Sequence, residues 1–163
     1  MIQTYTYAYD ATWQDKLASY KIGTAAALPI TYDVIGNPLN YDGWTYTWEK
    51  GRQLKQMASS EKTVEFAYDA NGLRVQKKVI EGSTVTTTDY FLHGKLLTHQ
   101  KVTTTVNGVQ QGEPEQMHFF YDAQSRPAMV NFNGTLYTYV HNLQGDIVAI
   151  VDSMGAKGGR IQV

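Results

Sequence analysis

The sequence predicts an all-β fold built from repeated antiparallel hairpins, and three observations predict it. First, a short phrase with an aromatic residue, an acidic residue and then a glycine recurs along the 163 residues. Second, Asn-Gly and Asp-Gly pairs separate runs rich in Thr, Tyr and Val, which is the strongest short-range signal for a hairpin. Third, helical periodicity is nearly absent, and we expect a single turn of helix at 13–19, with Thr12 as its cap.

The clearest copy of the phrase is Tyr68-Asp69-Ala70-Asn71-Gly72-Leu73. Its aromatic residue ends a strand, and the Asp side chain can accept a hydrogen bond from a backbone N–H two residues later. Gly then takes the positive φ that closes the turn. Because the phrase recurs, we expect structural turn residues at Tyr32, Asp33, Gly36, Trp48, Glu49, Gly51, Tyr68, Asp69, Gly72, Tyr121 and Asp122.

Between the turns, alternating β-prone residues predict a series of strands. Asp42-Gly43, Asn107-Gly108 and Asn133-Gly134 mark hairpin turns, and 107–116 is expected to be a loop insertion. No composition break divides the chain, so we expect one repeat array over 1–163. The expected strands are 2–9, 28–33, 44–49, 52–57, 63–69, 73–80, 84–92, 95–106, 116–121, 128–132, 135–141 and 147–151.

Composition narrows the classes of partner. The chain has 14 basic and 15 acidic residues, a formal net charge of -1, whereas nucleic-acid or anionic-membrane binding normally requires a strongly basic face. The apolar run 147–151 is one strand long, far short of the roughly 18 residues of a membrane span. Residues 1–5 show no features of a signal peptide. Cys is absent, which excludes disulfides, thiolate metal sites and cysteine nucleophiles.

The Tyr-Asp phrases resemble the YD repeats of RHS proteins, a family of bacterial polymorphic toxins, wall-associated proteins and related shells. The segment 139–155, which contains Leu143-Gln144-Gly145-Asp146, resembles the opening of the RHS-associated core. The resemblance implies a curved or spiral β-strip that is part of a hollow shell. It also implies a larger secreted or cell-surface protein that encloses or presents a C-terminal toxin. The Asp-Pro motif of self-cleavage is missing, so autoproteolysis does not carry over.

No catalytic or metal-binding constellation stands out. His93 and His99 lack carboxylates at ligand spacing, and His118 and His141 flank Tyr-rich strands, where we expect them to fill cross-strand positions. Asp33, Asp69 and Asp122 occupy matching repeat positions, which favours turn formation over catalysis. There is no Walker loop, no GxGxxG and no HExxH. We therefore expect no enzymatic activity, no cofactor and no metal.

Two non-enzymatic functions remain open. In the first, the chain is a structural shell segment whose partners are the neighbouring repeats and the toxin cargo. In the second, it is an extracellular carbohydrate-binding or adhesion module, because Trp44, Tyr46 and Trp48 alternate on one strand and could stack on glycans. The end strands 2–9 and 147–151 lack protective charges, so we also expect self-association edge to edge.

Overall fold

The computed structural model describes residues 4–157, which fall into two compact units, 1–66 and 67–163. In the first unit, β1 (Tyr5–Tyr9), β2 (Leu17–Ile22) and β3 (Leu28–Pro29) form a three-stranded antiparallel sheet. They are followed by β4 (Asn40–Tyr41), β5 (Trp44–Glu49), β6 (Gln53–Ala58) and β7 (Thr63–Tyr68). These four strands pair in antiparallel order, β4 with β5, β5 with β6 and β6 with β7. The boundary between the units falls inside β7.

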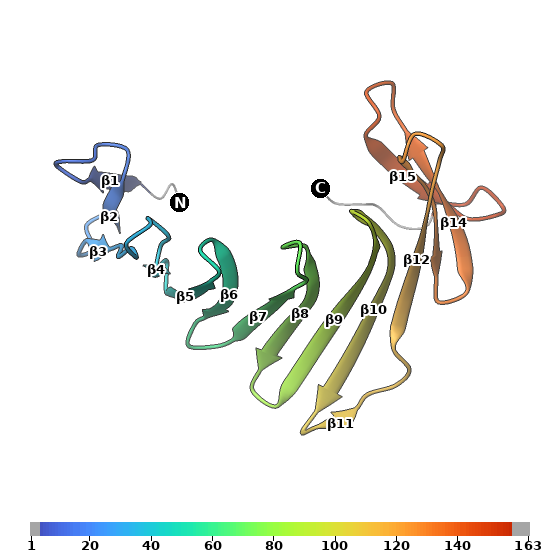
Figure 1. The fold of residues 1–163 in the computed structure, drawn as a ribbon, viewed down its shortest axis with the longest axis horizontal. Coiled ribbons are helices and arrows are strands. Elements are labelled where there is room, and N and C mark those ends of the chain that lie inside the picture. The colour runs from blue at the N-terminus through green and yellow to red at the C-terminus, as the bar shows by residue number, and fades with distance from the viewer. Residues whose placement is uncertain (1–3, 158–163) are drawn as a thin grey trace. The chain divides into compact units, whose positions relative to one another are not determined.

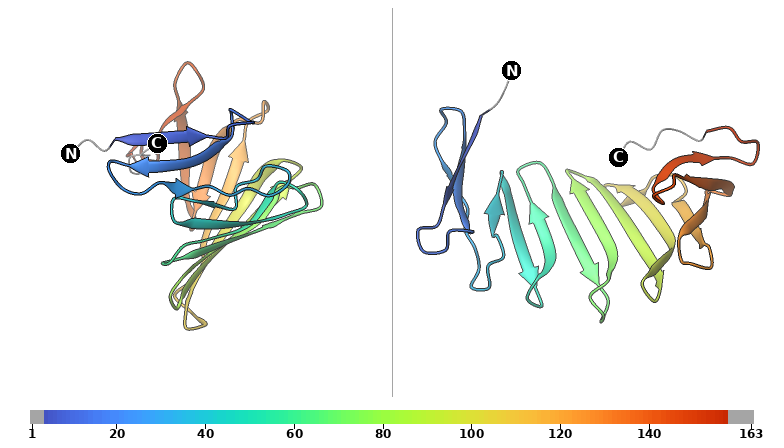
Figure 2. Two further views of the ribbon diagram at one scale, coloured as in Figure 1. Left: turned by 90° about the vertical axis from the view of Figure 1, so that its left-hand side faces the viewer. Right: turned by 90° about the horizontal axis from the view of Figure 1, so that it is seen from above.

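The second unit continues with antiparallel hairpins (Figure 1). Its sheet order is β8-β9-β10-β12-β13-β14-β15, and the short β11 pairs with β10. Figure 2 shows the strands of this unit lying side by side along its sheet. The strands are β8 (Arg74–Glu81), β9 (Thr84–His93), β10 (Leu96–Val106), β11 (Val109–Gln110), β12 (Glu115–Tyr121), β13 (Pro127–Phe132), β14 (Thr135–His141) and β15 (Ile147–Val151).

The prediction of an all-β fold of antiparallel hairpins is confirmed. No α-helix occurs within residues 4–157, and no helix long and apolar enough to span a membrane is found there. The predicted strands from 44–49 onward are confirmed to within one residue at either end. Of the first predicted strand, 2–9, residues 2 and 3 lie outside the described part of the chain, and Tyr5–Tyr9 form β1.

Two predictions near the N-terminus were wrong. The expected helical turn at 13–19 is a connection that leads into β2, and its first backbone N–H groups are bound by Asp10 rather than by Thr12. The Asp10 Oδ1 atom accepts the N–H groups of Thr12 and Trp13, both at 2.9 Å. The expected strand 28–33 is reduced to the two residues of β3, because Asn40 holds the backbone beyond it. Asn40 accepts the N–H of Thr31 and donates to the carbonyl of Pro29, each at 2.7 Å.

The first unit has a small aromatic core. Tyr20, on β2, is 2% exposed, packs against the Tyr41 ring with a centroid distance of 5.0 Å, and donates its hydroxyl to Asp42 Oδ1 at 3.0 Å. Tyr32 donates its hydroxyl to the carbonyl of Leu17 at 2.7 Å. These contacts bind the loop between β3 and β4, and the β4–β5 turn, to the three-stranded sheet.

The second unit has much less core. Among its described residues, Val130, at 6% exposed, is the only buried apolar side chain. Most other side chains on its strands are half-buried, because one layer of sheet covers its side chains only with their lateral neighbours. The cohesion of this unit therefore depends on strand pairing and on the turns that fix the register.

The three Asn-Gly and Asp-Gly pairs form tight hairpin turns, as predicted. Both central residues have positive φ at Asp42-Gly43 (50° and 78°), Asn107-Gly108 (51° and 79°) and Asn133-Gly134 (48° and 91°). This is the type I′ pattern that matches the right-handed twist of paired strands. In the expected loop insertion 107–116, the Asn107-Gly108 turn leads into β11, which pairs with the end of β10.

We predict that the Gly108→Val variant loses about 1–3 kcal/mol of unfolding free energy. A Cβ at Gly108 would meet nothing within 4 Å, so the cost is purely that of forcing a β-branched residue to positive φ. The matched control is Gly108→Asn, which should lose less because Asn tolerates this conformation. Urea unfolding measures both variants, and equal midpoints would contradict the prediction.

Candidate functional site

The residues singled out by the sequence belong mainly to a turn geometry that occurs five times. In each turn, the N–H of the first residue donates to the carbonyl of the fifth, and the N–H of the fourth donates back to the carbonyl of the first. The side-chain Oδ1 of the first residue accepts the N–H groups of the third and fifth residues. The first residues of the five turns are Asp33, Asp69, Asp122, Asn142 and Asp152.

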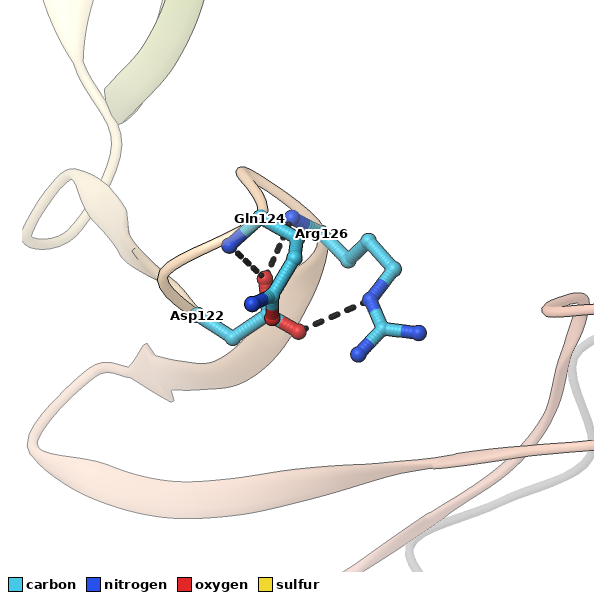
Figure 3. Close-up of polar contacts among 3 residues, drawn as sticks. All are labelled: Asp122, Gln124 and Arg126. Carbon is cyan, nitrogen blue, oxygen red and sulfur yellow. Dashed lines mark hydrogen bonds and ion pairs between the residues drawn. The ribbon is translucent and has the colours of Figure 1, made fainter.

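The Asp122 turn shows the geometry in detail (Figure 3). Asp122 Oδ1 accepts the N–H of Gln124 at 2.8 Å and that of Arg126 at 2.9 Å, while Oδ2 accepts the Arg126 Nε–H at 2.8 Å. The N–H of Arg126, foremost among these donors, lowers the pKa of Asp122. Ser125 stands where the other four turns have Gly, and it takes a φ of 62°.

The Asp33 turn is also bound to the turn between β5 and β6 of the first unit. Asn37, which is buried, donates its amide to Asp33 Oδ2 at 2.8 Å and to the carbonyl of Gly51 at 2.6 Å. Desolvation acts to raise the pKa of Asp33, but hydrogen bonds from Asn37 and Ile35 outweigh it, and the pKa is lowered. The charged form is therefore favoured by folding, so its contribution to stability is present above the unfolded pKa and is lost as the pH falls.

The tyrosines before the turns bind to neighbouring strands. Tyr121 donates its hydroxyl to the carbonyl of Leu97 in β10 at 2.7 Å, as Tyr32 does to Leu17. Burial raises the pKa of both hydroxyls, so they stay protonated donors. Tyr68 precedes the Asp69 turn in the same way, and Gly72 has a φ of 79°. An aromatic ring and an Asx turn thus act together at these junctions.

Glu49 does not share this geometry. Its hairpin closes with Glu49 paired to Gln53, and positive φ falls at both Lys50 (45°) and Gly51 (85°). The Glu49 carboxylate lies 3.6 Å from the Lys55 ammonium. The shortened phrase has one residue between its acidic residue and Gly51, whereas the Asp69 phrase has two before Gly72. It therefore forms a different turn.

The sequence reasoning did not identify Asn142 and Asp152 as turn formers of the same kind. His141 and Val151 precede them, so the aromatic residue that marked the other copies is absent. The signal that does identify them is Asn or Asp followed three residues later by Gly, here Gly145 and Gly155, both with positive φ.

The three aromatic residues proposed as a sugar platform lie on the covered face of β5. Trp44, Tyr46 and Trp48 are half-buried, whereas Thr45 and Thr47 between them are exposed. The Trp48 indole N–H donates to the carbonyl of Pro38 at 2.7 Å, and burial raises the pKa of Tyr46. This arrangement uses the aromatic face for packing within the first unit.

Clusters of titratable side chains and surface hollows are the features of the described residues that bear on catalysis. Within 4–157, no three His, Asp or Glu side chains gather at metal-binding distance. A hollow of about 490 Å³ in the second unit borders the Asp122 turn and is lined by Asp122, Arg126, Tyr139 and His141, among others. Another open hollow, of about 560 Å³, is lined by Glu113, Pro114, Gln116, His118, Asn131, Asn133 and Gly134. This second hollow holds none of the carboxylates that the sequence singled out.

Comparisons with known proteins give two kinds of similarity. No protein-family model matches the chain. It is 31% identical over 136 residues to the tRNA3(Ser)-specific nuclease WapA of Bacillus spizizenii and to the tRNA nuclease WapA of Bacillus subtilis strain 168. It is 30% identical to the tRNA(Glu)-specific nuclease WapA of Bacillus subtilis subsp. natto. Each match covers 82% of this chain but 5% of the relative.

A solved structure shares the fold. The crystal structure titled TcdB2-TccC3-TEV matches 98% of this chain and 10% of its own chain, with a TM-score of 0.57 and 16% identity. The repeated Tyr-Asp turns, the antiparallel hairpins and the similarity to the WapA proteins lead to one assignment. The chain belongs to the RHS/YD-repeat proteins.

Proposed function

We propose that the chain is a structural segment of the β-shell of a larger exported RHS protein. The observation that carries the proposal is the turn geometry repeated at five places, in which Asp or Asn side chains accept backbone N–H groups. A catalytic site requires one special constellation of groups. A scaffold requires the same junction many times, as repeat proteins do.

The comparisons support a role as part of a longer chain. The chain spans about 5% of the curated WapA relatives and 10% of the chain in the solved structure. The names of the relatives describe tRNA nucleases, and we assign no step of that reaction to this segment. We propose that the shell encloses or presents a C-terminal toxic domain of the larger protein, and that this larger protein is secreted or located at the cell surface. Residues 139–155 are proposed as the opening of the RHS-associated core.

The proposed partners of this segment are neighbouring repeats. Among the described residues, β1 and β15 stand at the ends of their sheets, and Val148 on β15 is 57% exposed. Beyond the Asp152 turn, Lys157 forms an isolated antiparallel bridge with Val151 at the end of β15. Free strand edges bind further strands by backbone hydrogen bonds.

The carbohydrate-binding alternative has less support. A stacking platform needs exposed aromatic faces, and Trp44, Tyr46 and Trp48 are half-buried, with the Trp48 N–H already bound. Glycan binding therefore requires these rings to leave their packed positions.

We predict that the isolated chain self-associates through its strand edges as its concentration rises. Light scattering after size exclusion gives the mass over a concentration series. The Val148→Lys variant, on the edge strand β15, should shift the mass towards the monomer. Leu136→Lys is the matched control, because Leu136 is 44% exposed on the interior strand β14. Equal masses for both variants, or a strictly monomeric parent chain, would mean that the edges do not associate.

We predict that Asp69→Ala lowers the unfolding free energy by about 1 kcal/mol, because two backbone N–H groups lose their acceptor. These are the N–H groups of Asn71 and Leu73, at 2.8 and 2.9 Å from Oδ1. Asp69→Asn keeps the acceptor, as Asn142 does in its own turn, and should lose less. Chemical unfolding compares the two. Equal losses would show that the charge, rather than the acceptor geometry, stabilises the turn.

We predict that the tryptophans of β5 are shielded from acrylamide relative to Trp13, which is 58% exposed. A variant with Trp13→Phe reports on Trp44 and Trp48. A second variant with both of those residues changed to Phe reports on Trp13. Quenching should be stronger in the second variant. Stronger quenching in the first, reduced by added oligosaccharide, would favour the carbohydrate-binding function.

A further inference from the structure

Three parallel rings cross three neighbouring strands of the second unit. His99 on β10 is paired in register with Phe91 on β9 and with His118 on β12. The Phe91 and His99 rings lie 4.9 Å apart with an interplanar angle of 16°, and the His99 and His118 rings lie 4.2 Å apart with an angle of 6°. His99 is therefore held between two rings, while Phe91 and His118 are exposed at the outside of the stack.

This position suits a neutral imidazole and disfavours a charged one. The Nε2 atom of His99 is buried and has no hydrogen-bond partner. Burial lowers the pKa of His99, and the charges of His118 and Lys101 act in the same direction. A side-chain hydrogen bond with Gln116 acts against them but leaves Nε2 unpaired.

Few negative charges are available to compensate a protonated His99. The charged and titratable groups on the same face of these three strands are Asp89 and His93 on β9, Lys101 on β10 and His118 on β12. Asp89 already accepts a hydrogen bond from Gln76 of β8 at 2.8 Å. Glu113 and His118 both line the open hollow of about 560 Å³.

The stack lies at the end of a short seam between strands. β10 pairs with β12 at four positions, from His99↔His118 to Val102↔Glu115, whereas it pairs with β9 at ten. No tight turn joins β10 directly to β12, because the connection passes through β11. This seam therefore depends on side-chain contacts more than a hairpin closed by a two-residue turn does.

We propose that the His99–His118 pair is an acid-sensitive latch on the β10–β12 seam. When His99 is neutral, its ring stacks on the His118 ring and holds the seam closed. When His99 is protonated, a charge lies between two rings, 4.2 Å from the His118 ring and with Nε2 lacking a hydrogen-bond partner, and the seam opens. This inference goes beyond the shell function and does not depend on it.

The direction of the pH effect follows from the lowered pKa of His99. Its stabilising effect is complete above the unfolded value of about 6.5 and is lost as the pH falls from there through the folded pKa. One such group can change the folding equilibrium constant by up to about tenfold per pH unit within that window.

The test measures amide hydrogen-exchange protection in the full chain between pH 7.5 and pH 5. We expect protection to fall at Gln100 and Met117, which pair across the seam, while Val130 and Tyr137 across β13–β14 keep theirs. Protection factors are corrected for the intrinsic pH dependence of exchange. A uniform loss over all strands, or no loss at the seam, would overturn the proposal.

Two variants separate titration from packing. His99→Phe keeps a stacking ring, and His99→Gln removes it, so only the second should weaken the seam at pH 7.5. Both should abolish the loss of protection on acidification. His93→Gln, on β9 but outside the stack, is the matched control and should behave like the parent chain. If a His99 variant that folds keeps the pH dependence of the parent, the latch does not exist.

Discussion

The hydrogen bonds from an Asp or Asn side chain to the backbone of its own turn are the constraint on which the strand pairing depends. A hairpin register that slips by one residue moves every side chain to the opposite face, and a sheet with little core cannot correct such a slip by packing. Asp69 and Asp122 prevent it locally, because each Oδ1 atom holds the third and fifth residues of its turn at fixed positions. The tyrosine before each of these turns then faces the neighbouring strands, as the Tyr121 hydroxyl does towards Leu97.

The two units use this junction in different surroundings. In the first unit, the Asp33 turn is bound through Asn37 to Gly51, and Tyr20 supplies a buried ring. In the second unit, the junctions stand without such a core, and lateral contacts between strands, such as the Phe91–His99–His118 stack, take its place. Stability in that unit is therefore spread along the sheet, as expected for a repeat protein in which each hairpin contacts only its neighbours.

Local chemistry made most of the hairpins predictable from the sequence. Asn-Gly pairs and Asp-x-x-Gly phrases fix backbone conformation over a few residues, so the strands between them follow. Features set by distant contacts were not predictable. The strand Leu17–Ile22 was missed because its pairing with β1 outweighs a weak helical pattern. The turns at Asn142 and Asp152 were missed for a local reason, since no aromatic residue directly precedes them. The contact between His99 and His118 needs the register of β10 against β12, which an intervening β11 hides from any reading of spacing.

The way β9 and β10 lengthen together has a consequence for how such arrays change during evolution. These strands have 10 and 11 residues, whereas β12 and β13 have 7 and 6. The extra length and β11 lie at the Asn107-Gly108 end, away from the junctions at Asp69 and Asp122, and the chain re-enters the sheet at β12 opposite β10. An insertion of this kind extends one hairpin without shifting the frame of those that follow. The length of an individual hairpin can therefore change while the order and the register of the other strands stay the same.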